Sequence, residues 1–340
     1  MIIHSKVLVT GGAGFIGSEL VRQLVAAGAS VTVLDNLSTG KRSNLAGIPS
    51  SACKLVEGDL RDSKLVLSLL PGISHLFHLA CVGIRRSVHN PREAHEVNAG
   101  GTLTLLELAR KMKLKRFVYV SSSEVFGNFL SYPLSETHPT FPTTVYGASK
   151  LAGEAYARAY SKTYGLPVVI VRPFNSFGPR CHHEGDAGEV IPRFLLRLMA
   201  GKELPVFGDG TQVRDFTFVE DTARGILLAA QCERAVGETI HLGSGKGLSI
   251  LELGGAMAEI LGIKTPQFHN YPHRPGDVQK LVANSNHAKK MLGWGPEVPF
   301  EEGLRRLAAW YASQGIAPET LLEEEILLNW ESSDADSLNG

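Results

Sequence analysis

A glycine-rich turn that joins a strand to a helix restricts the fold of this chain more than any other feature. The turn, Gly11–Gly17, directly follows the strand-like run Val7–Thr10, and apolar side chains then recur every three or four residues up to Ala27. Gly28 stands where a glycine commonly ends a helix. Strand, turn and helix in this order predict the first unit of a parallel sheet that carries helices on its faces.

The same alternation continues through the first half of the chain, where short apolar runs are separated by segments with helical spacing. We predict strands at Val7–Thr10, Val31–Leu34, Lys54–Val56, His75–His78, Phe117–Ser121 and Val168–Arg172. We predict further helices at Gly100–Met112, Tyr146–Tyr164 and Leu251–Leu261, the last with the capping pattern Ser249-x-x-Glu252. The predicted fold class is α/β, a Rossmann-like doubly wound parallel sheet with a smaller C-terminal substrate-binding domain.

The regular alternation ends near Gly178, after which Pro, Gly and His gather in Pro179–Gly188. We therefore expect one domain over residues 1–177 and a second over residues 178–330. A strand-like stretch at Thr239–Leu242 predicts that a segment near residues 215–245 returns to the first domain, so that the two are interleaved. The polar, acidic residues 331–340 are expected to form a disordered tail.

Charge and cysteine content argue against several classes of partner. The chain has 340 residues with 34 Lys plus Arg and 34 Asp plus Glu, and it lacks the basic stripe that binds nucleic acid or anionic lipid. No apolar run approaches the ~18 residues of a membrane span, and an early charge interrupts any secretory signal. The four cysteines are far apart, which is typical of reduced thiols. We expect a cytoplasmic protein without nucleic-acid or membrane partners.

The glycine turn and an acid after the second strand point to a dinucleotide. Gly11 can make the tight turn, Gly14 lets the backbone approach a pyrophosphate, and Gly17 lets the helix pack closely on the sheet. Asp35 follows the predicted strand Val31–Leu34, where a carboxylate accepts hydrogen bonds from ribose hydroxyls and repels a 2′-phosphate. This pattern favours NAD over NADP.

Tyr146 and Lys150 lie one turn apart in a predicted helix, so the phenol and the ammonium project from the same face. A phenol has an ordinary pKa of about 10, too high for a base at neutral pH. We expect the ammonium and an oxidised nicotinamide to favour the phenolate. Tyr146 is then a general base for a sugar or alcohol hydroxyl, and Lys150 lowers its pKa and holds the ribose.

Ten short motifs follow one another along the chain: Gly11–Gly17, Asp35-Asn36, Gly58-Asp59-Leu60, His78-Leu79-Ala80, Asn98 with Gly101-Thr102, Ser121–Gly127, Tyr146–Lys150, Arg172-Pro173-Phe174-Asn175, Arg214-Asp215-Phe216 and Arg274-Pro275-Gly276-Asp277. In content and order they resemble the motifs of the extended short-chain dehydrogenase/reductase family, in particular its nucleotide-sugar epimerases and dehydratases. The resemblance covers residues 5–312.

The resemblance implies a role for each matching residue. NAD would be bound by Gly11, Gly14, Phe15, Ile16, Gly17, Asp35, Asn36, Gly40, Asp59, Leu60, Leu79, Ala80, Asn98, Tyr146, Lys150 and Pro173. A nucleotide-diphosphate sugar would be bound by Arg85, Arg86, Ser122, Asn175, Val190, Phe207, Arg214, Arg274 and Asp277. Catalysis would rest on Tyr146, Lys150, Ser122, Ser123 and Glu124. The helices Gly100–Met112 and Tyr146–Tyr164 resemble those of a dimer interface in relatives, which implies a homodimer.

The reaction implied is a transient oxidation of the sugar at C4 by a bound NAD, through a 4-keto intermediate. The loop Cys81–Pro91 is similar to the substrate loop of hexose and hexuronate 4-epimerases, where Arg85 or Arg86 would meet a sugar carboxylate or a phosphate. The resemblance therefore implies a UDP-sugar 4-epimerase before other members of the family.

The chain departs from the epimerase pattern at Glu124, where epimerases commonly have Thr or a small residue. A carboxylate beside a 4-keto sugar can remove the C5 proton, so a dehydratase or a UDP-glucuronate decarboxylase is an alternative. The Asp that precedes this Glu in dehydratases, and protonates the leaving hydroxyl, is Ser123 in this chain. A non-catalytic NAD-binding or RNA-binding scaffold is an alternative of another class, disfavoured by Ser122, Tyr146 and Lys150 together.

The segment Arg180-Cys181-His182-His183-Glu184-Gly185-Asp186 contains several metal-ligand types, but consecutive His side chains do not share one face. We expect no metal and interpret this segment as a loop that covers the substrate.

Overall fold

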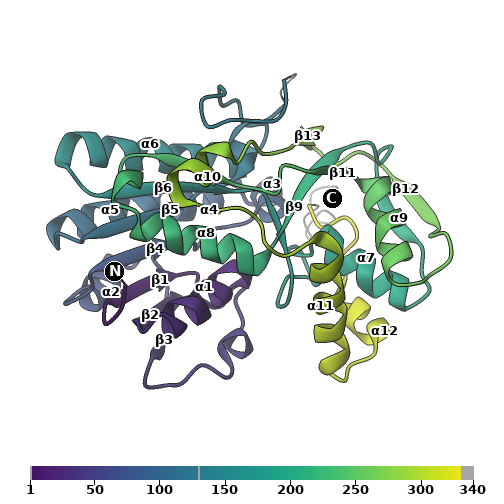
Figure 1. Cartoon of the computed structure of the whole chain (residues 1–340), viewed down its shortest axis with the longest axis horizontal. Coiled ribbons are helices and arrows are strands. Elements are labelled where there is room, and N and C mark those ends of the chain that lie inside the picture. The colour runs from purple at the N-terminus through teal and green to yellow at the C-terminus, as the bar shows by residue number, and fades with distance from the viewer. Residues whose placement is uncertain (1, 129–130, 331–340) are drawn as a thin grey trace, which may run out of the picture.

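A parallel sheet of seven strands forms the larger part of the structure, a computed structural model that describes residues 2–128 and 131–330 (Figure 1). The strands are β1 (Lys6–Thr10), β2 (Ser30–Asp35), β3 (Cys53–Glu57), β4 (His75–His78), β5 (Arg116–Val120), β6 (Val168–Pro173) and β10 (Thr239–Leu242). Their order is β10-β6-β5-β4-β1-β2-β3. The chain runs from β1 out to β3 and then returns to the other side of β1, so the order reverses between β1 and β4.

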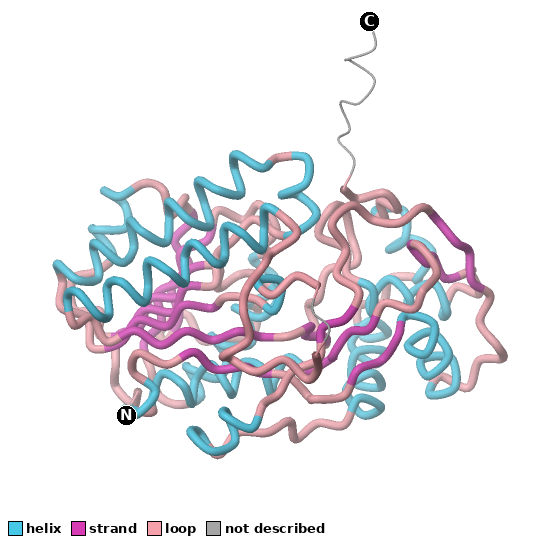
Figure 2. The backbone as a smooth tube through the Cα atoms, turned by 90° about the horizontal axis from the view of Figure 1, so that it is seen from above, coloured by secondary structure: helices cyan, strands magenta, loops and turns pink. Residues whose placement is uncertain are grey.

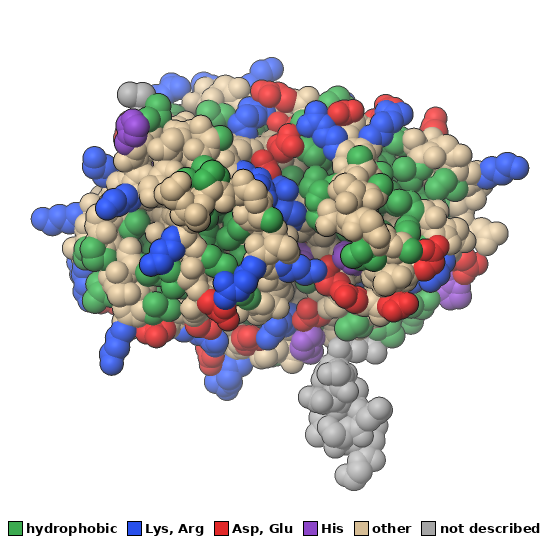
Figure 3. All heavy atoms as spheres, turned by 90° about the horizontal axis from the view of Figure 1, so that it is seen from below, with side chains coloured by type: hydrophobic (Ala, Val, Ile, Leu, Met, Phe, Trp, Pro, Cys, Tyr) green, Lys and Arg blue, Asp and Glu red, His purple; other side chains and the backbone are tan. Residues whose placement is uncertain are grey.

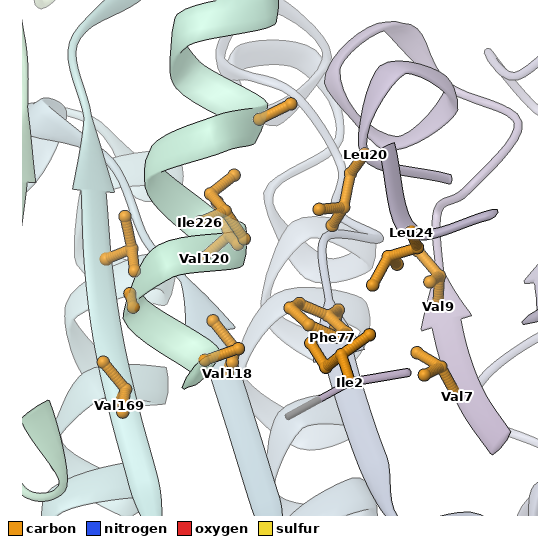
Figure 4. Packing of buried hydrophobic residues seen from close by; sticks show 14 of the residues in the cluster. Ile2, Val7, Val9, Leu20, Leu24, Phe77, Val118, Val120, Val169 and Ile226 are labelled. Atoms are coloured by element: carbon orange, nitrogen blue, oxygen red, sulfur yellow. The ribbon is translucent and has the colours of Figure 1, made fainter. Parts of the chain in front are cut away.

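Helices cover both faces of this sheet (Figure 2). The helices around it are α1 (Phe15–Ala26), α2 (Ser63–Leu69), α3 (Ile84–His89), α4 (Pro91–His95), α5 (Thr102–Lys111), α6 (Val145–Tyr164), α8 (Val219–Gln231) and α10 (Asn286–Leu292). Side chains alternate along a strand, so Val7 and Val9 pack under α1 and α8 while Leu8 faces the cluster on the opposite side. Figure 4 shows Leu20, Leu24 and Ile226 meeting the strand residues on the first face. Both faces are therefore apolar, as a doubly wound sheet requires.

The predicted fold class is confirmed, and each predicted strand lies within one residue of an observed one. The predicted helix Gly100–Met112 is wrong at its start. The helical backbone already begins upstream, because a π-helical turn, Glu96–Gly101, joins α4 to α5. Gly101 lies against Leu60, where a Cβ would collide, so this glycine serves close packing and does not open the helix.

The smaller part of the structure lies at the carboxyl edge of the large sheet. In it β9 (Val213–Phe218) pairs with β7 (Asn175–Phe177), β11 (Gly247–Ser249) and β13 (Lys280–Leu281), and β8 (Leu204–Phe207) pairs with β12 (Phe268–Tyr271). Its helices are α7 (Val190–Met199), α9 (Ile250–Ile260), α11 (Phe300–Ser313) and α12 (Pro318–Leu321). The predicted capping box of Ser249 and Glu252 begins α9.

The predicted return of residues 239–242 is confirmed, since β10 pairs in parallel with β6. The helix before it, α8, also packs on α1 of the large sheet, whereas β9 belongs to the smaller sheet. The boundary at residue 177 stays a prediction. The predicted disordered tail, residues 331–340, lies outside the described residues.

Within residues 2–128 and 131–330, no helix combines the length and the apolar character needed to cross a membrane. On the face shown in Figure 3, Lys and Arg side chains are interspersed with Asp and Glu over the whole view. Opposite charges thus alternate on this face of the molecule, in keeping with the equal numbers of both signs in the sequence.

Stability should fall in mild acid because His241 of β10 is fully buried. Its ring lies against Phe126 and Phe174, and burial together with the charge of Arg172 lowers its pKa to about 3 from an ordinary 6.5. As the pH falls below 6.5, this histidine becomes protonated in the unfolded chain but stays neutral in the native protein. The free energy of unfolding therefore decreases between pH 6.5 and 3. We expect His241 alone to lower the free energy of unfolding by about 2 kcal/mol between pH 7.5 and 5.0.

Urea unfolding of the wild type and His241→Asn at these two pH values measures this contribution. Asn retains a donor toward the Leu134 carbonyl, 3.2 Å from Nδ1 of His241, but does not titrate. An equal pH dependence in the two proteins would contradict the assignment.

Candidate active site

A cavity of about 400 Å³ opens at the carboxyl edge of the large sheet, where the strand order reverses between β1 and β4. A smaller cavity of about 90 Å³ continues from it toward α7 and β8. The two share Arg85, Asn175 and Val190 in their walls. Ligands of open α/β sheets bind at this reversal point, because the loops on either side of it diverge and leave a crevice.

The glycine turn forms one wall of the main cavity. Gly11 has φ +72°, and a Cβ on it would lie 2.6 Å from the amide nitrogen of Ala80. A Cβ on Gly17 would collide with the carbonyl oxygen of Gly11, which confirms that α1 begins in close contact with the turn. The first amide groups of α1 follow at the cavity wall, so the site suits the pyrophosphate of a dinucleotide.

Asp35 ends β2 in the wall of the same cavity. Its two carboxylate oxygens accept hydrogen bonds from the amides of Ala13 and Leu37, each at 2.9 Å. Burial raises its pKa, and these amides oppose the rise. A Cβ on Gly40 would lie 2.8 Å from Oδ1 of Asp35, so the following loop is held close over the carboxylate. A carboxylate oxygen has lone pairs beyond those used here, which suits ribose hydroxyls.

Helix α6 presents Tyr146 and Lys150 to the cavity, as their spacing predicts. Thr144 caps this helix by accepting a hydrogen bond from the Gly147 amide at 3.1 Å. The buried Lys150 ammonium donates to the Val120 carbonyl at the end of β5, at 2.6 Å, and lies 4.7 Å from the centre of the Tyr119 ring. The same strand leads into Ser122, so the three residues of the predicted catalytic group meet at one wall.

In the chain by itself the pKa of Tyr146 is raised, and the expected influence of the Lys150 ammonium with an oxidised nicotinamide stays a prediction. Burial raises the pKa of the phenol, and Cys81 and Glu124 add to the rise. The opposing influence is a hydrogen bond with Ser122. The ammonium is engaged with the Val120 carbonyl, and burial also lowers its own pKa. Desolvation therefore dominates at both groups, a balance that residue spacing does not reveal.

Glu124 and Ser123 also line the main cavity. The backbone amide of Glu124 donates to the Ser122 hydroxyl at 3.2 Å, which holds these two residues close together although Ser123 stands between them. Burial raises the pKa of Glu124, while the guanidinium of Arg214 opposes the rise.

The arginines of the substrate side differ in how they are neutralised. Arg86 forms a bidentate ion pair with the Glu93 carboxylate at 2.9 and 3.1 Å, and Arg214 forms an ion pair with Asp277 at 2.7 Å. Arg85 lines both cavities and forms no ion pair with any residue the structure describes. Burial lowers its pKa to about 9. Of the two arginines predicted in this loop, Arg85 is thus the one available to a substrate anion.

Nearly all predicted cofactor residues line the main cavity: Gly11, Gly14, Phe15, Ile16, Gly17, Asp35, Asn36, Gly40, Asp59, Leu60, Leu79, Ala80, Tyr146, Lys150 and Pro173. The predicted catalytic residues Ser122, Ser123 and Glu124 and the substrate residues Arg85, Arg86, Asn175 and Val190 line it too. Phe207, Arg214, Arg274 and Asp277 line the smaller cavity.

Asn98 is the exception, since it lies in neither wall. Its side chain accepts from the Val82 amide at 2.7 Å and donates to the Val82 carbonyl at 3.0 Å, and it donates to Ser149 at 3.0 Å. Asn98 therefore holds the loop after β4 against α6, behind the cavity wall.

Several other lining residues were not predicted, among them His182, Glu189 and Arg193. Burial raises the pKa of Glu189 to about 7. All three belong to the loop and helix after Gly178, where no periodic pattern marks which side chains turn inward. In that loop His182 and His183 both contact the Glu184 carboxylate, and His183 also forms a hydrogen bond with the Tyr311 hydroxyl. Residues 2–128 and 131–330 contain no group of three potential metal ligands.

A family model described as GDP-mannose 4,6 dehydratase matches residues 8–307. The chain belongs to the family of nucleotide-sugar epimerases and dehydratases. The resemblance seen in its motifs is thereby confirmed, including the placement in the extended short-chain dehydrogenase/reductase family.

Members of both reaction types are similar to it. A putative UDP-glucose 4-epimerase of Methanocaldococcus jannaschii is 34% identical over 89% of this chain and 97% of its own length. The solved dTDP-glucose 4,6-dehydratase of Streptomyces venezuelae, with NAD bound, is 37% identical, with a TM-score of 0.85 over 91% of this chain and 97% of that one. The UDP-glucose 4-epimerase of Thermotoga maritima, solved with UDP-glucose, is 33% identical, with a TM-score of 0.86 over 92% and 100%. Family membership thus leaves the type of reaction to the site.

Proposed function

We propose that this chain is a cytoplasmic UDP-sugar 4-epimerase that uses a tightly held NAD. The observation that supports this most strongly is the convergence of Tyr146, Ser122 and Lys150 on one wall of the main cavity. That cavity runs from the glycine turn to the arginines of the smaller one, so a dinucleotide and a nucleotide-diphosphate sugar have adjoining places.

The chain's own residues handle the proton in this reaction. Ser122 hydrogen-bonds to the Tyr146 phenol and holds it beside the sugar. Tyr146 removes the proton of the C4 hydroxyl and later returns it, and Lys150 contributes a positive charge behind the phenol and a donor for a ribose. When bound, NAD supplies the acceptor and donor of the C4 hydride. The cofactor would be held by the glycine turn and by Asp35.

A 4,6-dehydratase is the second candidate, because Glu124 lies in the cavity wall two residues after Ser122. Elimination of water needs a base for the C5 proton and an acid for the leaving hydroxyl. Glu124 can serve as the base, but the neighbouring position is Ser123, whose hydroxyl is a far weaker acid than a carboxyl group. This missing acid favours epimerisation.

The products of a panel of UDP- and dTDP-hexoses and hexuronates test the proposal. Conversion to an isomer of unchanged mass supports epimerisation, loss of water indicates dehydration, and loss of carbon dioxide indicates decarboxylation. Should NAD be bound while no nucleotide sugar is converted, the non-catalytic scaffold gains support.

Glu124→Thr separates the two reactions in a second way. An epimerase needs no base at C5, so we expect kcat for 4-epimerisation to stay within about tenfold of the wild type. A dehydratase would lose its C5 base and about 10²–10⁴-fold in kcat. Ser123→Asp is the converse variant, which restores the acid, and mass spectrometry of its products shows whether water is then lost. Dehydration at the wild-type rate by Glu124→Thr would remove this carboxylate from the reaction.

We also propose a homodimer through α5 and α6. Several large apolar side chains on these helices or directly after them are exposed in the single chain: Leu103, Met112, Val145 and Tyr164. Two copies packed through these helices would cover such residues in a shared apolar face.

A further inference from the structure

The last part of the described chain, residues 317–330, folds back onto the substrate side of the molecule. We call it the C-terminal arm. It follows the span matched by the family model, which ends at residue 307, and it contains α12 and the turns after it. In Figure 1 the yellow end of the chain turns back from α12 toward the middle of the molecule. The arm therefore lies outside the pattern from which the site residues were predicted.

Glu325 of the arm forms ion pairs with two arginines of α7, Arg193 and Arg197. Its carboxylate accepts from Nε of Arg193 at 2.6 Å and from Nη2 and Nε of Arg197 at 2.6 and 3.0 Å. The side chains of Glu325 and Arg193 are each only 4% exposed. Because one carboxylate faces two guanidinium groups, this cluster keeps a positive charge.

Arg193 is thereby aimed at the smaller cavity, whose wall it forms. Its Nη2 is buried and has no hydrogen-bond partner among the residues the structure describes. A buried N–H without a partner is costly, and a ligand oxygen in the adjoining cavity would supply one.

Trp330, at the end of the arm, supports a second arginine. Its ring stands edge-on to Phe207 at 4.9 Å between centroids. The Arg274 guanidinium lies 5.0 Å from the centre of Phe207 and 5.1 Å from that of Trp330. Arg274 and Phe207 line the smaller cavity, whereas Trp330 lies behind them. The Nε of Arg274 is also buried without a partner in the described part of the chain.

The arm also fixes the loop before α7. The backbone amide of Gly185 donates to the Glu324 carbonyl at 2.9 Å, and the side-chain amide of Asn329 donates to the Gly188 carbonyl at 3.4 Å. Gly188 lines the smaller cavity, so the arm contacts this wall as well as Arg193 and Arg274.

We propose that the C-terminal arm completes the subsite for the nucleoside diphosphate, with Glu325 and Trp330 as positioning residues for Arg193 and Arg274. The ligand that we infer is a diphosphate. Its oxygens can accept hydrogen bonds from the guanidinium N–H groups of Arg193 and Arg274 that have no partner in this buried, positively charged pocket. Its identification as part of a nucleotide sugar rests on the proposed function.

Binding of UDP to the NAD-loaded protein, measured by titration calorimetry, tests the role of Glu325. We expect Glu325→Gln to raise the Kd for UDP at least tenfold, because the amide no longer holds both guanidinium groups. Glu323→Gln is the matched control, since Glu323 lies in the same arm with an exposed side chain. We expect its Kd to stay within twofold of the wild type, and the NAD content of both variants to be unchanged.

Trp330 is tested by the pair Trp330→Ala and Trp330→Phe. The alanine variant should raise KM for the nucleotide sugar at least fivefold and leave kcat within twofold. The phenylalanine variant, which keeps a ring under Arg274, should restore most of the affinity. A merely structural role would instead lower kcat, NAD content and melting temperature together.

An unchanged Kd for UDP in both Glu325→Gln and Trp330→Ala overturns the inference. Should Glu325→Gln fail to fold, the Trp330 pair and Arg193→Lys decide, and wild-type UDP affinity in all three overturns it equally. Failure of the proposed function is distinct, because the wild type would then bind UDP but convert no nucleotide sugar.

Discussion

Replacing Tyr146 by Phe should lower kcat about 10³-fold while the protein still retains its NAD. The substitution removes one oxygen from a side chain that lines the main cavity beside Ser122, and leaves the ring that fills that place. Without the phenol, no other group that we place at C4 accepts the hydroxyl proton. Steady-state turnover of the substrate found in the product panel, with NAD released by denaturation and quantified, gives both values.

Tyr156→Phe is the matched control, because it removes the same atom from the same helix, α6, at a residue outside both cavity walls. We expect its kcat to stay within twofold of the wild type. Turnover by Tyr146→Phe at a rate close to that of Tyr156→Phe would refute the assignment of the base, whatever the reaction proves to be.

Replacing Glu154 by Ala should cost about 3–5 kcal/mol of unfolding free energy. Glu154 is fully buried on α6, and its two oxygens accept from Nε and Nη2 of Arg172 on β6, each at 2.7 Å. Removal of the carboxylate leaves a guanidinium inside the protein without a counter-charge, which is far more costly than loss of an exposed pair. The same pair ties the helix that carries Tyr146 and Lys150 to the central sheet.

Urea unfolding of the single variant and of the double variant Glu154→Met, Arg172→Met measures this effect. The double variant removes both charges, so we expect it to regain much of the lost stability. Glu107→Gln, which breaks the exposed pair with Lys111 on α5, should leave the unfolding midpoint unchanged. Equal losses in the single and double variants would show that packing, and not the unpaired charge, explains the cost.

The strands, the glycine turn and the Tyr–Lys pair could be predicted because each depends on neighbours close in sequence. Alternating apolar residues define a strand, and Gly11 and Gly17 are needed where the backbone turns with positive φ or where two backbone segments touch. The start of the helix predicted at Gly100 differs from the structure, because the π-helical turn Glu96–Gly101 already carries the helical backbone upstream of it.

The tertiary structure decided which charged side chains are paired within the protein and which are available to a ligand. Arg85 and Arg86 are adjacent and chemically identical, yet Glu93 neutralises only Arg86. Burial by distant segments likewise raises the pKa of Tyr146, an effect that residue spacing does not reveal. The sequence did not predict the roles of Glu189, Arg193 and the C-terminal arm. The first two follow a loop without a periodic pattern, and the arm lies beyond the family motifs.

From its sequence alone, this chain was bound to form a doubly wound sheet with a dinucleotide turn and a phenol one helical turn from an ammonium, because strand alternation, helical spacing and glycine sterics act over a few residues. Only the folded chain assigned partners to the charges around the substrate cavities. Ion pairing and desolvation depend on groups more than a hundred residues apart, as between Arg193 and Glu325, and these meet only when the tertiary structure forms.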